Sequence, residues 1–212
     1  MAQAVRVWGD YACFTRPESK VERITYNVPT PSACKGILDS IYCKPQEMVW
    51  VIDKIHVLNP INHINMTRNE IGQSMCPTYN KIKKLKEGKK VINERDVIQR
   101  NTQILTNVDY IIEAHFEFRE EAKDSGKYVN IWERRLTYGQ CYQQPYLGCR
   151  EFGCYFKPQE EPFPSSVFKN TKIDLGLMLH SVDYNILKPR LFNPVMIDGI
   201  IDVKNAKILE CE

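Results

Sequence analysis

The sequence predicts an α+β fold, a ferredoxin-like βαββαβ domain with an insertion and a β-rich extension. Segments of strand and helix character follow the order strand, helix, strand, insertion, strand, helix, strand, which is a split βαβ pattern. Strand-like pieces then recur at 173–184 and 190–203, broken by proline and glycine. We therefore expect one domain over 1–148, with its insertion at about 61–105, and a C-terminal β-sheet extension over 149–212.

The first predicted element is a strand over residues 4–14. In this segment Val5 and Val7 alternate with Arg6 and Trp8, and an alternation of period two is typical of a strand with one buried face.

The next predicted element is a helix with a well-defined start. Thr30 is placed to be its N-cap and Pro31 its first residue. Ile37 and Ile41 share one face, one turn apart. Pro45 ends the helix, because the residue before a proline avoids helical geometry.

Two further strands flank a basic tract. Residues 48–58 are rich in valine and isoleucine, and residues 108–118 alternate apolar and polar side chains. Between them, the run KIKKLKEGKK at 81–90 reads as a solvated loop or hairpin tip, with a nucleic-acid contact as the alternative.

A second helix is predicted from about Lys127 to Tyr138. Trp132 and Leu136 lie at helical spacing on it, and Gly139 ends it.

Composition restricts the class of protein without naming a partner. Hydrophobic residues make up 43% and charged residues 26%, as in an ordinary globular protein, and the net charge of +3 does not by itself imply nucleic acid. No run approaches the ~20 apolar residues of a membrane span, and the N-terminus lacks the apolar run of a signal peptide, so we expect a cytoplasmic protein. The eight cysteines should then be reduced, and their spacing completes no zinc site, so we expect neither a metal nor a cofactor.

The two predicted helices bring basic and phenolic residues together. In a βαββαβ unit the helices run antiparallel, so the end of the first lies near the start of the second. These ends carry Tyr42 and Lys44 on one side and Lys127 and Tyr128 on the other. The cluster suits an anion, helped by the positive end of the second helix dipole. The alternative is that Tyr42 covers the first helix and Lys127 is solvated.

Four long motifs carry a resemblance to a known family. They are WGDYACFTRPE at 8–18, VPTPSACKGILDSIYCKP at 28–45, NVDYIIEAHFEF at 107–118 and ERRLTYGQCYQQPYLGCREF at 133–152. In these segments the chain resembles the type I-C (Dvulg-subtype) CRISPR-associated family of Cascade subunits that process pre-crRNA as ribonucleases. The resemblance extends from the first strand to about residue 200.

The resemblance implies a fold, a reaction and partners. It implies an RRM-related N-terminal domain and metal-independent cleavage of CRISPR repeat RNA at the base of its hairpin. It also implies that the protein stays bound to the 5′ handle of the mature crRNA in the Cascade surveillance complex. There the partners would be the repeated backbone subunit and the large subunit, with a possible contact to target DNA.

The same resemblance suggests catalytic residues. The family tyrosine at the end of the first helix corresponds to Tyr42, and the family lysine before the second helix to Lys127. The family histidine position is occupied by Tyr128. Histidine titrates near neutral pH, whereas tyrosine titrates near ~10 and is a poorer base. We expect Lys127 to stabilise phosphate charge, Tyr42 to orient or activate the 2′-hydroxyl, and Tyr128 to act as a weaker donor.

RNA binding needs cations for phosphates and flat groups for unstacked bases. The alternative for this part of the chain is a helix with a solvated basic face followed by an ordinary aromatic strand. The candidate RNA-binding residues are Arg16, Lys20, Arg23, Lys44, Trp132, Arg134, Arg135, Gln143, Gln144 and Arg150.

Two functions therefore remain open at the level of sequence. One is an endoribonuclease that matures crRNA and stays bound to it. The other is a non-catalytic subunit that binds the 5′ handle, with processing slow or lost. Tyr128 is the residue that separates them.

Overall fold

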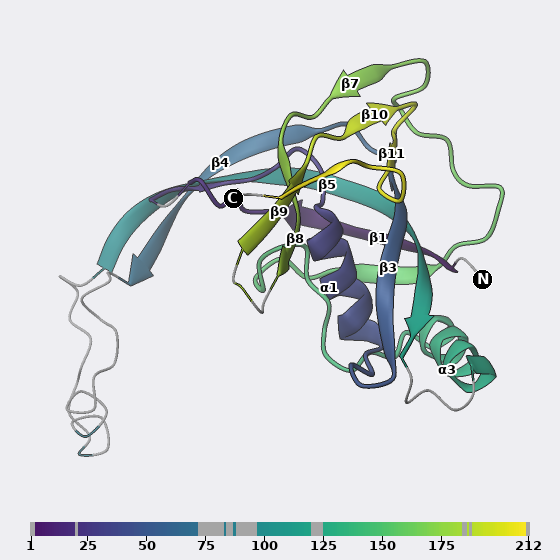
Figure 1. Cartoon of the computed structure of the whole chain (residues 1–212). Coiled ribbons are helices and arrows are strands. Elements are labelled where there is room, and N and C mark those ends of the chain that lie inside the picture. The colour runs from purple at the N-terminus through teal and green to yellow at the C-terminus, as the bar shows by residue number, and fades with distance from the viewer. Residues whose placement is uncertain are drawn as a thin grey trace.

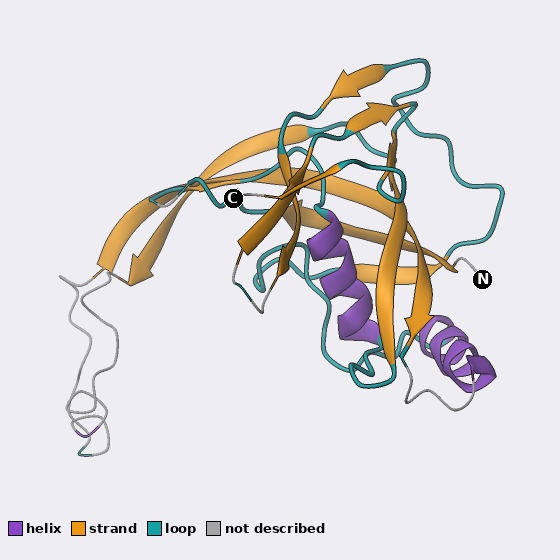
Figure 2. Ribbon diagram, in the orientation of Figure 1, coloured by secondary structure: helices purple, strands orange, loops and turns teal. Residues whose placement is uncertain are grey.

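The computed structural model describes residues 3–19, 21–71, 83, 87, 97–119, 125–183, 186 and 188–210. These residues form a mixed α+β structure whose main component is an antiparallel sheet (Figure 1 and Figure 2). The helices are α1 (Pro31–Ile41) and α3 (Ser125–Thr137). The strands are β1 (Gln3–Ala12), β2 (Arg23–Ile24), β3 (Met48–Val57), β4 (Asn62–Ile71), β5 (Val97–Phe118), β6 (Tyr155–Pro158), β7 (Lys172–Asp174), β8 (Met178–Asp183), β9 (Lys188–Phe192), β10 (Val195–Ile197), β11 (Ile200–Asp202) and β12 (Ile208–Glu210).

The main sheet, as far as the described residues show it, has nine strands, with the order β6-β1-β5-β3-β11-β10-β7 along its path. β1 and β3 each pair antiparallel with the C-terminal half of β5, so Val5 lies opposite Ile112 and Trp50 opposite Phe116. The apolar sides of these strands are buried, as the alternating pattern predicts. The predicted strands at 4–14, 48–58 and 108–118 are confirmed with small changes at their ends.

Helix α1 begins as its sequence predicts. The Thr30 side chain accepts a hydrogen bond of 3.1 Å from the backbone N–H of Ala33, and Pro31 is the first helical residue. The helix ends earlier than expected, at Ile41, and Tyr42 is its C-cap in an extended conformation. Tyr42 therefore lies where the chain turns from α1 toward β3.

The described part of the predicted insertion is a long two-stranded arm. β4 pairs with the N-terminal half of β5 from Asn62↔Thr106 to Ile71↔Val97, and Figure 1 shows this arm extending away from the rest of the molecule. β5 runs unbroken for 22 residues, so the predicted strand at 108–118 is the second half of a longer one. Most of the lysine-rich run at 81–90 lies outside the described residues.

The C-terminal strands extend the same sheet. β11 pairs with β3 through Ile201↔Ile55, β10 and β7 follow it, and β8, β9 and β12 form a separate three-stranded sheet. β6, which follows residue 148, pairs with β1 at the other edge. Segments on both sides of the predicted boundary at 148/149 therefore contribute strands to the same sheet.

None of the helices in the described ranges is long and apolar enough to cross a membrane.

Candidate functional site

The junction between α1, β3 and α3 holds the three predicted catalytic residues. Helix α1 ends at Ile41, the turn after it leads into β3, and α3 begins at Ser125. Glu47, the last residue before β3, is bound to one predicted phenol and acts on the other only through its charge. Its carboxylate accepts a hydrogen bond from the Tyr128 hydroxyl, and its negative charge also acts on Tyr42.

Tyr42 is buried, with a fractional exposure of 2%. Its backbone carbonyl accepts a hydrogen bond of 3.0 Å from the indole Nε1 of Trp50, which fixes the end of α1 against β3. Its hydroxyl is buried and has no hydrogen-bond partner within the described residues. Burial raises the pKa of Tyr42, the nearby guanidinium of Arg135 opposes that shift, and Glu47 adds to it.

Tyr128 and Lys127 lie side by side in sequence but face different surroundings. Tyr128 is 3% exposed, packs its ring 5.4 Å from that of Phe118, and is bound through its hydroxyl to Glu47. Lys127 is exposed in the first turn of α3. In this conformation only the lysine of the three predicted catalytic residues reaches solvent.

Arg135 and Trp132 do not lie as RNA-binding residues would. The Arg135 guanidinium lies 5.0 Å from the centroid of the Tyr42 ring and donates a hydrogen bond to the carbonyl of Ile41, so it joins α3 to the end of α1. Trp132 is fully buried, with its ring centroid 4.5 Å from that of Trp50. The expectation that Trp132 stacks on an RNA base is wrong for this conformation, because the apolar face of α3 uses its indole in the core.

Several predicted RNA-binding residues are exposed. Lys44 lies in the turn after α1 and Arg134 on the outer face of α3, whereas Arg150 lies farther along, in the loop that contacts Arg23 and Arg68 through Glu151. Gln143 and Gln144 are also exposed, although each side chain already donates a hydrogen bond to the protein. These bonds reach Ser40 Oγ at 3.4 Å and the Cys154 carbonyl at 3.2 Å.

The basic residues before α1 are less available for contacts with RNA, because their side chains are already engaged within the protein. Arg16 lies 4.8 Å over the ring of Tyr26 and donates to the Thr25 carbonyl. Arg23 forms ion pairs of 3.0 Å with Glu70 and 3.4 Å with Glu151.

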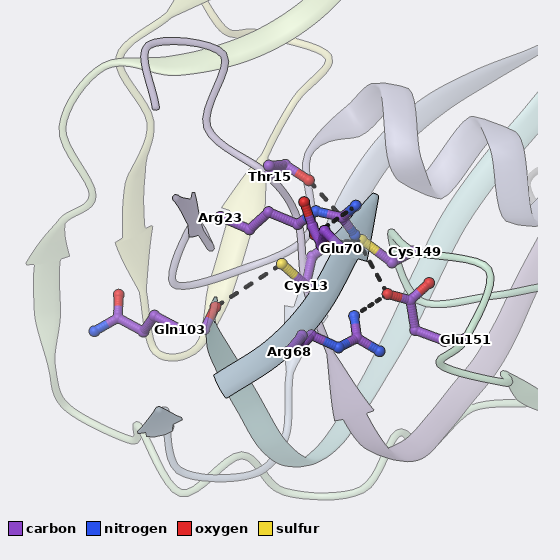
Figure 3. A network of polar contacts seen from close by, with 8 residues as sticks. All are labelled: Cys13, Thr15, Arg23, Arg68, Glu70, Gln103, Cys149 and Glu151. Carbon is purple, nitrogen blue, oxygen red and sulfur yellow. Dashed lines mark hydrogen bonds and ion pairs between the residues drawn. The ribbon is translucent and has the colours of Figure 1, made fainter. Parts of the chain in front are cut away.

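Arg68 shares the Glu151 carboxylate with Arg23, which ties the arm to the loop after α3 (Figure 3). Two arginines and two glutamates in one cluster leave little net charge for a phosphate, so Arg23 is a weaker candidate than the sequence indicated. Lys20 lies outside the described residues.

Sequence reasoning missed Glu47 as part of the site, whereas two tyrosines of the aromatic and basic segment after α3 are exposed there. Tyr138 and Tyr142 are 73% and 78% exposed, and the backbone N–H of Tyr142 donates to the Ser40 carbonyl near the end of α1. These rings are suited to stacking on unpaired bases.

Comparisons with known proteins place the chain in a family. A family model described as "CRISPR-associated protein (Cas_Cas5)" matches residues 4–204. This chain belongs to the Cas5d family of CRISPR-associated proteins. The resemblance carried by the four sequence motifs is thereby confirmed.

Two relatives carry the name CRISPR pre-crRNA endoribonuclease Cas5d. One, from Mannheimia succiniciproducens, is 41% identical over 96% of this chain and 96% of its own length. The other, from Thermus thermophilus, is 40% identical over 85% of this chain and 72% of its own length.

Solved structures agree on the fold of this Cas5d-family chain. One titled as a CRISPR-associated protein is 27% identical, covers 96% of this chain and 92% of its own, and has a TM-score of 0.71. Another, a functionally uncharacterized protein from Streptococcus mutans, is 26% identical with the same coverage and a TM-score of 0.69.

Proposed function

We propose that this chain is a pre-crRNA endoribonuclease. It cuts CRISPR repeat RNA at the base of the repeat hairpin without a metal ion, and it keeps the 5′ handle of the product in the type I-C Cascade complex. The observation that carries the proposal is the match over 96% of both chains, at 41% identity, to a protein named for this activity. The partners would be the repeated backbone subunit and the large subunit, with target DNA as a further contact, in the cytoplasm.

The proposed scaffold is a ferredoxin-like unit made of β1, α1, β3, the second half of β5, α3 and β6. The order β6-β1-β5-β3, with every neighbouring pair antiparallel, supports this assignment. Both helices contact Trp50, because Tyr42 accepts its indole hydrogen bond and Trp132 packs on its ring. Such a scaffold brings the end of α1 close to α3.

In the proposed reaction the ribose 2′-hydroxyl attacks the adjacent phosphorus. The bond from phosphorus to the 5′-oxygen breaks, and a 2′,3′-cyclic phosphate forms. One proton must leave the 2′-hydroxyl and one must reach the departing 5′-oxygen. The Lys127 ammonium stabilises the charge on the phosphate oxygens, Tyr42 orients or activates the 2′-hydroxyl, and Tyr128 donates a hydrogen bond in place of a histidine.

The burial of the two phenols sets a condition on this mechanism. The Tyr128 hydroxyl is bound to Glu47, and the Tyr42 hydroxyl is covered. RNA binding must therefore open the contact between Tyr128 and Glu47, and separately uncover the Tyr42 hydroxyl, before these phenols can reach the scissile phosphate. The cost of that opening, together with the high pKa of an ordinary phenol, makes the proposed reaction slower than one that uses histidine.

The proposed RNA path runs from this junction across the exposed side of α3. Lys44, Lys127 and Arg134 supply positive charge, and Tyr138 and Tyr142 supply exposed rings. Gln143 and Gln144 would read base edges only by exchanging their present hydrogen bonds for bonds to RNA.

The second candidate function is a subunit that holds the 5′ handle without cutting it. Tyr128 at the histidine position, and its engagement with Glu47, are the observations that favour it.

The test is a cleavage assay on the cognate repeat hairpin RNA with excess chelator, using wild type, Tyr128→His and Glu47→Gln. A second substrate carries a single 2′-deoxy nucleotide at the cut site. The proposal predicts one cut in the all-RNA substrate, a cyclic phosphate end, and faster cutting by Tyr128→His. Equal cutting of the 2′-deoxy substrate would contradict 2′-hydroxyl attack. Tight binding with no cutting by wild type would leave the handle-binding subunit as the function.

A further inference from the structure

The edge of β3 that faces away from β5 is divided into a paired half and an open half. From Asp53 onward this edge is paired, because the Asp53 carbonyl accepts from Val203 N–H at 2.9 Å and β11 pairs with residues 54–56. The preceding residues, Met48–Ile52, line a groove of about 890 Å³ between α1 and the C-terminal strands. The sheet therefore ends on this side in a short strand edge at the bottom of the groove, where Met48, Trp50 and Ile52 are 3%, 2% and 6% exposed.

Backbone geometry identifies the groups that this open edge presents. The Arg119 N–H donates to the Glu47 carbonyl at 2.9 Å, so Glu47 points its carbonyl toward β5. Because backbone groups alternate along a strand, those of Val49 and Val51 also point toward β5, and those of Trp50 point into the groove. The close approach of the Trp50 and Phe116 rings, 4.1 Å between centroids, agrees with a non-hydrogen-bonded pair. Neither the N–H nor the C=O of Trp50 has a hydrogen-bond partner among the described residues.

A β-bulge marks the point where pairing begins. The register of β3 against β5 shifts between Ile52 and Lys54, so Ile52 and Asp53 both direct their backbone groups outward. The Asp53 carbonyl accepts hydrogen bonds from the segment after β11, whereas Ile52 lies beside the groove. A guest strand along 48–52 would continue the line of β11.

The groove has the lining of a peptide site. Its walls include aliphatic side chains, such as Val49, Val51 and Ile208, and its large aromatic residue, Trp50, has a buried side chain. The rings that remain among these lining residues are the imidazoles of His115, which is bound to Asp53, and His180, so the groove offers an unpaired base no exposed Phe, Tyr or Trp ring. Two cations bracket the open edge. Arg119 lies opposite Glu47 at one end, and the Lys204 N–H bonds to the Asp53 carbonyl at the other.

We propose that this edge of β3 binds an extended polypeptide segment of a neighbouring subunit, which adds a strand to the sheet beside Met48–Ile52. Backbone hydrogen bonds to Trp50 and Ile52 hold the segment, and its alternate apolar side chains contact the aliphatic walls. Of the four cations in the lining, Lys35 pairs with Asp39 and Arg190 with Asp183. Arg119 and Lys204 lie at the two ends of the open edge, so the segment carries acidic residues toward its ends. The inference rests on the proposed function in one respect, that the chain works within a complex.

The test is amide hydrogen exchange at single-residue resolution in three samples: the chain alone, the chain with repeat RNA, and the complex purified through a tag on this chain. We expect the Trp50 and Ile52 amides to exchange at least about tenfold more slowly in the complex than in the other two samples. The Val49 and Val51 amides, already bonded to β5, should be slow in all three. Equal protection by RNA alone would make RNA the occupant. Unchanged exchange in the complex, or protection without alternation, would also overturn the proposal.

A charge-reversal pair supplies a second readout. Lys204→Glu should lower the yield of co-purified protein subunits several-fold, whereas Lys169→Glu, an exposed lysine outside the groove lining, should leave it unchanged. RNA cleavage by the isolated chain should be the same for both variants. A loss of cleavage without a change in exchange would count against the proposed function and not against the strand edge. Equal subunit yields for the two variants would contradict the acidic segment.

Discussion

Arg134 and Arg135 are neighbours on α3 that the structure assigns to opposite roles, and this contrast gives the sharpest prediction. Arg135 donates to the carbonyl of Ile41 and lies 5.0 Å over the Tyr42 ring. A hydrogen bond to a charged group contributes about 1.5–3 kcal/mol, and a cation–π contact about 0.5–2 kcal/mol. The two share one guanidinium and do not add fully, so Arg135→Ala should cost about 2–3 kcal/mol of unfolding free energy.

For a domain of this size, a loss of 2 kcal/mol lowers Tm by about 4–8 °C. Arg134 is exposed, so Arg134→Ala should change unfolding free energy by no more than about 0.5 kcal/mol. It should instead weaken RNA binding and reduce the salt dependence of binding by about one counterion, because it removes one phosphate contact. The assays are urea unfolding and RNA binding at several salt concentrations. Equal stability of the two variants would refute the role assigned to Arg135.

Three further predictions concern packing and thiol chemistry. Trp132→Ala should cost about 3–5 kcal/mol in urea unfolding because the indole is fully buried, whereas Tyr138→Ala, at a ring 73% exposed, should leave stability nearly unchanged; similar losses would contradict the core position of Trp132. Gly148→Ala should be destabilising by more than the roughly 1–2 kcal/mol of a left-handed backbone, because an added Cβ would lie 2.0 Å from the Cys13 carbonyl oxygen; near-wild-type unfolding would rule that packing out. The neighbouring Cys13 thiol lowers the pKa of Cys149, so iodoacetamide at pH 7 should label Cys149 faster than an ordinary thiol. The stability from this lowered pKa is present at high pH and is lost as pH falls through it, and labelling should slow over the same range; a rate that follows an ordinary thiol pKa would contradict the pairing.

Local patterns in the sequence predict the central strands and both helices because each pattern has one local cause. Thr30 and Pro31 set the start of α1, and alternation sets the buried face of β5. The length of β5 could not be read in the same way. Its first half pairs with β4 in an arm whose exposed faces carry no strong alternation of apolar residues.

The candidate site was predicted in part, because sequence names the residues near a junction but not what they contact. Tyr42 lies against Arg135 in the last turn of α3, whereas Tyr128 in the first turn is bound to Glu47, a residue of the turn after α1 for which no local pattern signals this role. Trp132 could be read either as part of an apolar helical face or as an aromatic group for RNA. Its ring contacts with Trp50 and Phe116 show that it belongs to the core.

Cationic side chains present the same difficulty. A sequence does not distinguish an arginine free to meet phosphate from one already paired, as Arg23 is with Glu70 and Glu151. The close approach of Gly148 to the Cys13 carbonyl is likewise a long-range contact that no local pattern signals. Long-range packing, which local patterns do not encode, decides each of these cases.

The central claim is that this chain cuts repeat RNA at the junction of α1 and α3. Single-turnover cleavage of the repeat hairpin by wild type and Lys127→Ala, with RNA affinity measured in parallel, tests it most directly. Loss of the only exposed charge among the three proposed catalytic residues should slow cutting by about 10²–10³-fold while RNA affinity falls only slightly. Cutting by Lys127→Ala at the wild-type rate would place the reaction elsewhere on the molecule and contradict the account.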